Sequence, residues 1–386
     1  MRVLHIDPAK LYGGVETFLV TLARYRLLCP EMEPEFAVCF EGRLAAELAT
    51  SGVWIHRLSD VRVRNPLSIL RARQRLARLA VAHHVEVFVC HMPWSQALFG
   101  PVARKLRLPL VFWQHSATLG RHWLERWANL TPPDRAVAPS RFVAATVPNI
   151  FPRLHAEAIY YPVPAPPAYT DEQRLAVRRE LNVAPESVVI VQAGRLSSVK
   201  GYKDHILALG RLHAVPSWTC WIIGGVQQPG ERAYLKELKE TALRLGIGER
   251  VRFLGQRSDV SRLLAAADIY CQPNTGTEGL PVVFGEAMHA RLPIVSTRIG
   301  GFDELVDDSC GALATPGDYD AIARYLGELI ADPDLRARQG ASGQHKVERV
   351  GDPATQLNRI YQLVLSARQG TEPGGQKHSM SSGAWK

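Results

Sequence analysis

The 386-residue sequence lacks any run of about 18 uninterrupted apolar residues, so no transmembrane helix is expected. Its opening stretch, MRVLHIDPAKLYGG, contains no apolar core of signal-peptide length, which argues against secretion. Cysteine is scarce as well: the six cysteines are scattered, with no CxxC pair and no metal-like histidine spacing. Most of them lie in apolar stretches. We therefore expect a cytoplasmic protein with reduced, buried thiols.

Acidic residues are too few to balance the basic ones, and the net charge is +9. Residues 1–168 hold 20 Lys and Arg against 12 Asp and Glu, a net of +8, whereas the rest of the chain has a net of +1. Much of this excess comes from six arginines that flank a helical apolar pattern, namely Arg62, Arg64, Arg71, Arg73, Arg75 and Arg78. The basic face is either simply solvated or a surface for anionic lipid headgroups or an acidic acceptor. No motif or interleaved aromatic residue favours nucleic acid.

Length and composition predict two globular domains, because the chain is too long for one ordinary core and is 46% hydrophobic and 22% charged. In the first half, the buried-strand patterns RVLHI, FAVCF, EVFVC, LPLVFW and DRAVA alternate with helical patterns near 15–28, 66–83, 94–107 and 140–148. The alternation restarts after the proline-rich segment YYPVPAPPAYTDEQ, in SVVIVQAG, TCWIIGG, RVRFLG, DIYCQPN and PIVST. Such alternation predicts parallel sheets covered by helices on both faces.

We therefore expect two doubly wound α/β domains, over residues 1–168 and 173–352, joined by a linker at about 161–172. A final helix over 353–368 is expected to pack back on the N-terminal domain, and the polar, Gly/Ser-rich residues 369–386 are expected to form a disordered tail. Ligands of doubly wound sheets bind beyond the carboxyl ends of the strands. With two such domains facing each other, the expected site lies between them.

The stretch TEGLPVVFGEAMHARLP sets Glu278 and Glu286 eight positions apart. On a helix, this spacing separates the two carboxylates by about 12 Å along the axis, too far to share one proton. It suits two groups that grip different parts of one elongated ligand. Pro281 fits the first position of a helix, which would leave the N–H groups of Val282 and Val283 free for a phosphate.

Two other segments favour an anionic ligand. Gly194 ends a strand in VIVQAGRLSSVKGYKD, and Arg195 and Lys200 follow it in a short loop, a placement that suits a diphosphate. Gly13-Gly14 lies where the first strand passes into a helix, so that backbone N–H groups can approach an anion. Neither segment carries the GxGxxG dinucleotide fingerprint or the Walker pattern GxxxxGK[ST]. Each is also compatible with an ordinary turn or solvated charges.

Together these residues resemble the retaining glycosyltransferases of family 4, which have the GT-B fold of two Rossmann-like domains facing an interdomain cleft. The resemblance covers about residues 1–367. The family pattern EGLPxxxxEAMAxGxPVV is matched by Glu278-Gly279-Leu280-Pro281, by Glu286-Ala287-Met288 and by Pro293-Ile294-Val295. GRLxxxKG is matched by Gly194-Arg195-Leu196 and Lys200-Gly201, and GGxE by Gly13-Gly14 and Glu16.

The resemblance implies a role for each matched position. Arg195 and Lys200 would hold the donor diphosphate and stabilise the departing nucleotide, Glu286 would bind the ribose and Glu278 the donor sugar. His115, at the end of a strand in the first domain, matches a histidine that the family keeps facing the donor sugar. The catalytic candidates are thus His115, Glu278, Arg195 and Lys200. The implied donor-binding residues are Gly13, Gly14, Arg195, Lys200, Phe253, Glu278, Gly279, Leu280, Val282, Val283 and Glu286, with the base against the backbone around Arg252–Leu254 and Glu16 on the acceptor side.

Three residues depart from the family pattern. Arg291 replaces a glycine, His289 replaces an alanine, and Tyr161 stands where an asparagine often precedes the Pro-Val of the linker. None of them removes an implied donor contact. The loop Gly300-Gly301 resembles a family loop that lies near the site.

The resemblance implies transfer of a hexose, with retention, from a UDP- or GDP-linked sugar to a hydroxyl of a glycan, lipid-linked or other acceptor. The expected setting is bacterial cell-surface polysaccharide or glycolipid synthesis at the inner face of the membrane. No cofactor and no metal are expected, because the DxD at Asp318-Tyr319-Asp320 better suits a helix cap. The alternatives are a GT-B-fold sugar-nucleotide epimerase or phosphorylase, or a non-catalytic partner subunit. The retained donor contacts count against the last. Donor, acceptor and oligomeric state stay open.

Overall fold

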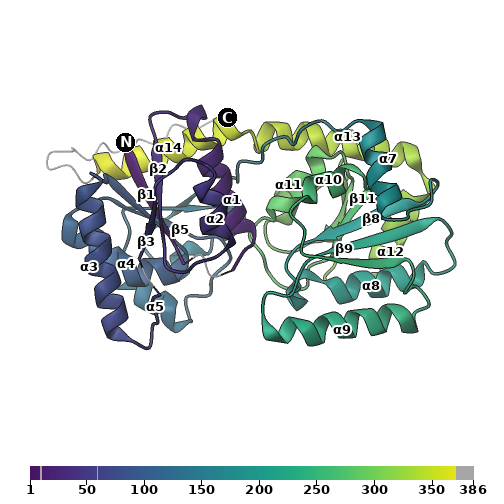
Figure 1. Ribbon diagram of the computed structural model, residues 1–386, viewed down its shortest axis with the longest axis horizontal. Helices are drawn as coiled ribbons and strands as arrows, with labels where there is room; N and C mark the ends of the chain where they lie inside the picture. Colours follow the sequence, from purple (N-terminus) through teal and green to yellow (C-terminus); the bar gives the residue numbers. More distant parts are fainter. Residues whose placement is uncertain (9–10, 59, 371–386) are drawn as a thin grey trace.

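Two parallel sheets organise the protein, of which the computed structural model describes residues 1–8, 11–58 and 60–370 (Figure 1). The first sheet has seven strands: β1 Arg2–Asp7, β2 Glu33–Val38, β3 Ile55–Arg57, β4 Val87–His91, β5 Leu110–Trp113, β6 Arg135–Ala138 and β7 Ala156–Ala158. The second has six: β8 Val188–Ala193, β9 Trp218–Ile223, β10 Val251–Gly255, β11 Ile269–Gln272, β12 Ile294–Thr297 and β13 Gly311–Ala314. The predicted pair of Rossmann-like domains is confirmed.

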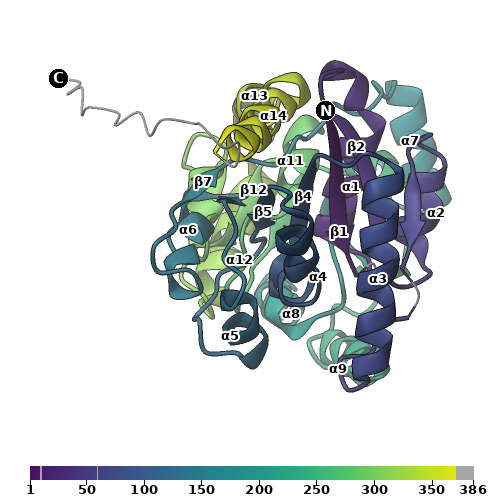
Figure 2. The same ribbon diagram turned by 90° about the vertical axis from the view of Figure 1, so that its left-hand side faces the viewer.

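Helices connect the strands and cover both faces of each sheet (Figures 1 and 2). In the first domain they are α1 Gly14–Arg24, α2 Arg43–Ala49, α3 Pro66–Ala82, α4 Met92–Leu106, α5 Trp123–Asn129 and α6 Arg141–Ala144. The others are α7 Asp171–Glu180, α8 Tyr202–Arg211, α9 Pro229–Arg244, α10 Val260–Ala265, α11 Val282–His289, α12 Tyr319–Ala331, α13 Pro333–Val350 and α14 Pro353–Gln369. Short 3₁₀ turns occupy η1 Arg26–Leu28, η2 Val147–Asn149, η3 Ser198–Lys200 and η4 Phe302–Glu304.

The strand order of the two sheets indicates where a ligand would bind. The first sheet runs β3-β2-β1-β4-β5-β6-β7 and the second β10-β9-β8-β11-β12-β13, so the order reverses between β1 and β4 and between β8 and β11. Loops leaving neighbouring strands at a reversal turn to opposite faces and open a crevice beyond the carboxyl ends. The loops after β1, β5, β8 and β11 and the helix α11 carry most of the residues singled out in the sequence, whereas Phe253 lies in strand β10.

The final helix α14 crosses back to the first domain, as Figure 1 shows. Asp352 caps it by accepting the N–H of Thr355 at 2.8 Å. Its apolar face, which includes Leu357, Ile360 and Leu363, is buried in the same core as β4 and β5. The disordered tail was predicted to begin at residue 369, but Gln369 still belongs to the last turn of α14; residues 371–386 lie outside the described residues. Within the described ranges, none of the helices combines the length and apolar content that crossing a bilayer requires.

Candidate active site

Lys200 and Glu278 form an ion pair at the carboxyl edge of the second sheet. The resemblance implied separate partners for them, a phosphate and a sugar, whereas here they neutralise each other. The second Glu278 oxygen accepts from Asn274 Nδ2 at 2.6 Å, and Asn274 in turn accepts from Gln272 Nε2 at 2.8 Å. Tyr270 donates to Gln272 at 2.7 Å and completes this buried polar network. The network holds the Glu278 carboxylate in one orientation.

Two glycines fit the loops around this ion pair. Gly201 has φ +69°, and a Cβ atom there would lie 1.6 Å from the carbonyl oxygen of Pro273. Gly300 has φ +63°, and its Cβ would lie 2.0 Å from the Glu278 carbonyl oxygen. Because any larger residue would collide with backbone, both positions require glycine. The Lys200 loop and the Gly300-Gly301 loop therefore hold the Glu278 loop from two sides.

Arg195 faces the glycine loop of the other domain. A Cβ atom at Gly13 would lie 3.5 Å from Arg195 Nε, and one at Gly14 would lie 3.6 Å from a Val282 methyl group. The Arg195 guanidinium makes no hydrogen bond or ion pair with any described residue. An unpaired cation beside a glycine loop and a helix N-terminus is a ready site for a phosphate.

The Glu16 side chain forms a hydrogen bond within the glycine loop. Its carboxylate accepts the N–H of Gly13 at 2.8 Å, and burial raises the pKa of this carboxyl, an effect that Arg195 partly opposes. The interaction shapes the glycine loop. The acceptor-side role implied for Glu16 stays a prediction.

Helix α11 begins one residue later than the sequence predicted. Pro281 is its N-cap, with extended φ −70° and ψ 123°, and the first helical residue is Val282. The expected consequence is preserved, since the N–H groups of Val282 and Val283 lie in the first turn, where a helix offers them no acceptor. Further along α11, burial raises the pKa of Glu286 to about 7. The Glu286 carboxyl makes no hydrogen bond within the part of the chain described.

His115 is held at both ring nitrogens. Its Nδ1 lies 2.6 Å from the hydroxyl of Tyr161, and its Nε2 lies 2.8 Å from His91 Nδ1. His91 Nε2 in turn lies 3.0 Å from His5 Nδ1. Burial lowers the pKa of His5 and of His115 to about 3 each and that of His91 well below its usual value. Three neutral imidazoles thus form one hydrogen-bonded chain, and contact between the His115 ring and a sugar would require one of these bonds to open.

Which nitrogen donates in each of these hydrogen bonds follows from His5, which stands at one end of the chain. His5 Nε2 is buried and has no partner among the described residues. Because a buried N–H without an acceptor is rarer than a buried lone pair, His5 Nδ1–H donates to His91, and His91 Nδ1–H donates to His115. His115 Nδ1–H then donates to Tyr161, which leaves the Tyr161 hydroxyl proton available. No periodic pattern in the sequence signals this chain, because its members come from β1, β4, the end of β5 and the linker.

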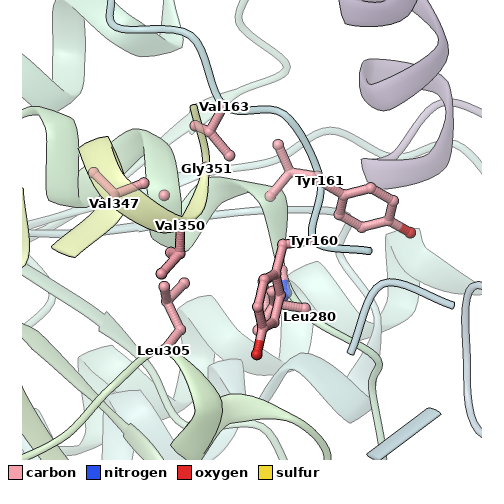
Figure 3. Close-up of a pocket in the computed structure, with 11 residues that line it drawn as sticks. Tyr160, Tyr161, Val163, Leu280, Leu305, Val347, Val350 and Gly351 are labelled. Carbon is pink, nitrogen blue, oxygen red and sulfur yellow. The ribbon is translucent and has the colours of Figure 1, made fainter. Parts of the chain in front are cut away.

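The linker also carries contacts between the domains. Figure 3 shows Tyr160 and Tyr161 side by side, with the Tyr161 ring directed away from Val347 and Val350. A small apolar cavity of about 20 Å³ lies beneath them, enough for about one water molecule. Tyr160 donates to Glu304 at 3.0 Å, and Glu304 also accepts the N–H groups of Arg141 and Phe142 at 2.9 and 2.8 Å. Glu304 therefore fastens η4 to the start of α6, a role that the sequence did not predict.

A larger hollow of about 230 Å³ lies in the first domain, beyond β4 and β5. It is lined by Met92, Pro93, Trp94, Gln114, Ser116, Ala117, His122, Leu124 and Glu125. Met92 has φ +66°, a costly conformation for this residue, and its sulfur lies 3.4 Å from the N–H of His115. The Oε1 of Gln114 is buried without a hydrogen-bond partner in the described structure. The hollow thus adjoins His115.

The remaining predicted positions lie on strand β10, at the contact between the domains, beside the linker cavity and at the start of α12. Phe253 lies in the edge strand β10, just before an irregularity in its pairing with β9, and the Lys239 ammonium lies 5.6 Å from the centre of its ring. Gly279 approaches the first domain so closely that a Cβ would lie 2.4 Å from the His115 carbonyl oxygen. Leu280 is buried beside the linker cavity. The DxD caps α12 as expected: Asp318 accepts the N–H of Ala321 at 2.9 Å.

Comparison with known proteins shows to which class of proteins the chain is similar. A sequence model described as "Glycosyl transferases group 1" matches residues 173–346, and one described as "Glycosyltransferase Family 4" matches residues 12–164. A crystal structure of Anabaena HepE in complex with UDP superposes with a TM-score of 0.83 at 24% identity, over 95% of this chain and 100% of that one. The fold is that of the GT-B glycosyltransferases.

Two curated relatives are mannosyltransferases. A GDP-mannose-dependent alpha-(1-6)-phosphatidylinositol monomannoside mannosyltransferase of Mycolicibacterium smegmatis is 29% identical over 80% of this chain and 84% of its own length. A phosphatidyl-myo-inositol mannosyltransferase of Mycobacterium leprae is 36% identical, over 32% of this chain and only 34% of its own length. With the two family models covering consecutive parts of the sequence, the chain belongs to the family 4 glycosyltransferases.

Proposed function

We propose that the protein transfers a hexose from a nucleoside-diphosphate sugar to a hydroxyl group with retention of the anomeric configuration. The observation that carries this proposal is the convergence of Arg195, Lys200 and the first turn of α11 opposite the Gly13-Gly14 loop. Two cations and free N–H groups at a helix start suit a diphosphate leaving group. UDP and GDP are the candidate nucleoside diphosphates of the donor sugar, because the Anabaena structure holds UDP and the Mycolicibacterium relative is GDP-mannose-dependent.

The Lys200–Glu278 ion pair gives the donor a defined way to bind. A diphosphate would draw Lys200 away from Glu278 and free the carboxylate to accept hydroxyl groups of the sugar. Glu286 would accept the ribose hydroxyls. The residues described at the junction include no carboxylate or thiol that the geometry marks as a covalent nucleophile, so we favour attack on the face from which the diphosphate departs, with a donor phosphate oxygen as base.

The hollow beside His115 is the proposed place for the acceptor. It adjoins the junction where the donor sugar would lie, and the polar residues Gln114, His122 and Glu125 are among those that line it. Trp94 supplies an aromatic surface for a ring-shaped polyol. A sugar or cyclitol with a free hydroxyl therefore fits this hollow, in line with acceptors named for the curated relatives.

The basic helix α3 supports a lipid-linked acceptor at an anionic membrane surface. Leu67 and Leu70 are 62% and 51% exposed on the face that also carries the exposed Arg71. Arg73, counted above with the basic face, instead turns inward and donates to the Leu98 carbonyl oxygen at 2.6 Å. Exposed leucines between arginines are typical of helices that lie in the headgroup region of a bilayer.

The experiment is a sugar-release assay with a panel of UDP and GDP sugars, with and without inositol or glycan acceptors, followed by NMR of the anomeric proton of the product. Transfer with retention is expected only when donor and acceptor are both present. Epimerised nucleotide sugar without acceptor would indicate the epimerase alternative, phosphate-dependent cleavage the phosphorylase, and no turnover of any donor the non-catalytic subunit. Full turnover by Glu278→Gln would contradict the role given to Glu278.

A further inference from the structure

A second cluster of metal-ligating side chains lies in the first domain, away from the junction. Glu35 comes from β2, His56 from the edge strand β3, and His83 follows the last turn of α3. Glu35 stands near the amino end of β2, where it pairs with Leu4 of β1. The donor and acceptor residues lie beyond the opposite, carboxyl ends of the strands. The cluster is therefore separate from the site described above.

The three side chains converge on one point. Their ligand atoms all lie within 4.8 Å of one another. Glu35 Oε2 is 2.6 Å from His56 Nε2 and 3.3 Å from His83 Nδ1, and the two imidazole rings meet edge to face with centroids 4.4 Å apart. Two histidine nitrogens and one carboxylate form a donor set that zinc uses, with a fourth position open to water.

The buried Glu35 carboxylate also favours a bound cation. The Glu35 side chain is 1% exposed, yet its Oε1 has no hydrogen-bond partner within the described residues. Hydrogen bonds from the two histidines can satisfy only Oε2, so Oε1 stays a buried carboxylate oxygen without a partner, which is unfavourable. A cation held by both carboxylate oxygens removes that cost, because Oε1 then becomes a ligand.

The surroundings allow an ion to enter. The His83 side chain is 24% exposed, and the ring of Trp54 lies against it edge-on at 5.3 Å. The cation nearest in the described contacts is Arg2, which donates to the His83 carbonyl oxygen at 2.7 Å and is itself paired with Glu33 at 3.2 Å. Its charge is thus balanced by a partner outside the cluster.

We propose that Glu35, His56 and His83 bind one divalent transition-metal ion, zinc being the best match for this donor set. The ion would join β2, β3 and the C-terminal end of α3. The proposal rests on this cluster alone and does not depend on the transferase reaction.

The test is metal binding by the full chain, carrying no histidine tag, after removal of metal with EDTA. Zinc is titrated by calorimetry, and cobalt is titrated by absorption because its spectrum reports coordination geometry. We expect one ion per chain and a rise in Tm of about 5 °C at a hundred-fold excess of zinc over its Kd. His56→Gln and His83→Gln should each weaken zinc binding by more than the about 10- to 100-fold that loss of an outer-shell partner causes.

The matched control is His84→Asn. His84 is exposed next to the cluster, and asparagine tolerates its φ of +51°. This variant should bind zinc as the wild type does. Binding of less than about 0.1 ion per chain by the wild type would overturn the proposal, as would unchanged binding in both histidine-to-glutamine variants. If His56→Gln fails to fold, the partly exposed His83→Gln decides the question. A chain that binds zinc but transfers no sugar keeps this proposal and removes the proposed function.

Discussion

Two of the residues that depart from the family pattern, Arg291 and His289, have clear structural effects. Arg291 follows the last turn of α11 with φ +59°, a left-handed conformation that glycine adopts at little cost. The family glycine at this position is therefore a helix C-terminal signal, and Arg291 pays for the conformation with backbone strain. His289, the last residue of α11, is the other departure; its Nε2–H donates to the Val163 carbonyl oxygen at 2.8 Å and so ties α11 to the linker.

The first prediction concerns Arg291. Because a Cβ atom in the left-handed region costs about 1 kcal/mol, Arg291→Gly should stabilise the second domain by about that amount. The measurement is thermal unfolding. Arg291→Ala removes the same charge but keeps the Cβ atom, so it should show no such gain. Equal stability of the glycine and alanine variants would refute the explanation.

The second prediction concerns the carboxyl of Glu286, whose pKa is raised to about 7 from an ordinary 4.5. Between these values, the folded chain keeps a proton that the unfolded chain has lost, so this carboxyl lowers stability as the pH rises through that window. Glu286→Gln cannot titrate. Its Tm relative to the wild type should therefore increase by a few degrees from pH 4.5 to 7.5. A constant difference in Tm across this range would show that the folded-state pKa is not raised.

At the scale of elements, the sequence predicted the long, strongly apolar strands and the helices α1, α3 and α4 within a few residues. It missed β3, β7, β13, α2 and α5, which have three to seven residues and are too short to show a period. The donor motifs were found because their residues are close together in sequence. The His5–His91–His115 chain, Glu304 and the Glu35 cluster were not, because their members meet only through the topology of the sheet.

The histidine chain leads to the third prediction. Tyr161→Phe removes the acceptor for His115 Nδ1–H and leaves a buried donor unpaired, which should cost about 1–3 kcal/mol of folding stability. Chemical denaturation measures this loss, and nitrogen NMR of the imidazoles should report a changed tautomer for His115. Tyr361→Phe, in which no hydrogen bond between described residues is lost, is the matched control. The assigned direction of the chain is wrong if the two variants are equally stable.

The fourth prediction concerns α3 as a membrane-facing element. At low salt, the wild type should sediment with vesicles that contain phosphatidylglycerol, and Leu67→Glu combined with Leu70→Glu should reduce the bound fraction several-fold. Leu243→Glu is the control, since Leu243 is at least as exposed, at 68%, on α9 of the other domain. Absence of binding by the wild type, or an equal loss in the control, would exclude α3 as the contact.

At the scale of the whole molecule, the two domains meet through loops that each sheet extends from its carboxyl edge. Besides the approach of Gly13 to Arg195, the backbone of Tyr12 exchanges two hydrogen bonds with the side chain of Gln227, at 3.1 and 3.2 Å. These contacts bring a glycine loop from one sheet over cations from the other. The two-domain architecture could be predicted from the repeated alternation of strands and helices, but the direct pairing of Lys200 with Glu278 could not, because it depends on how the two loops fold together.

The central claim is that this junction binds a nucleotide sugar through Arg195. Isothermal titration calorimetry with UDP and GDP sugars tests it most directly, with Arg195→Ala and the matched surface variant Arg211→Ala. Arg211 carries the same charge but pairs with Asp320 on the surface, at 2.7 Å. We predict that at least one donor binds the wild type and Arg211→Ala equally, and that Arg195→Ala binds it about 10- to 100-fold more weakly, as expected for a lost charge-assisted hydrogen bond. Equal binding by Arg195→Ala, or no binding of any donor by the wild type, would contradict the claim.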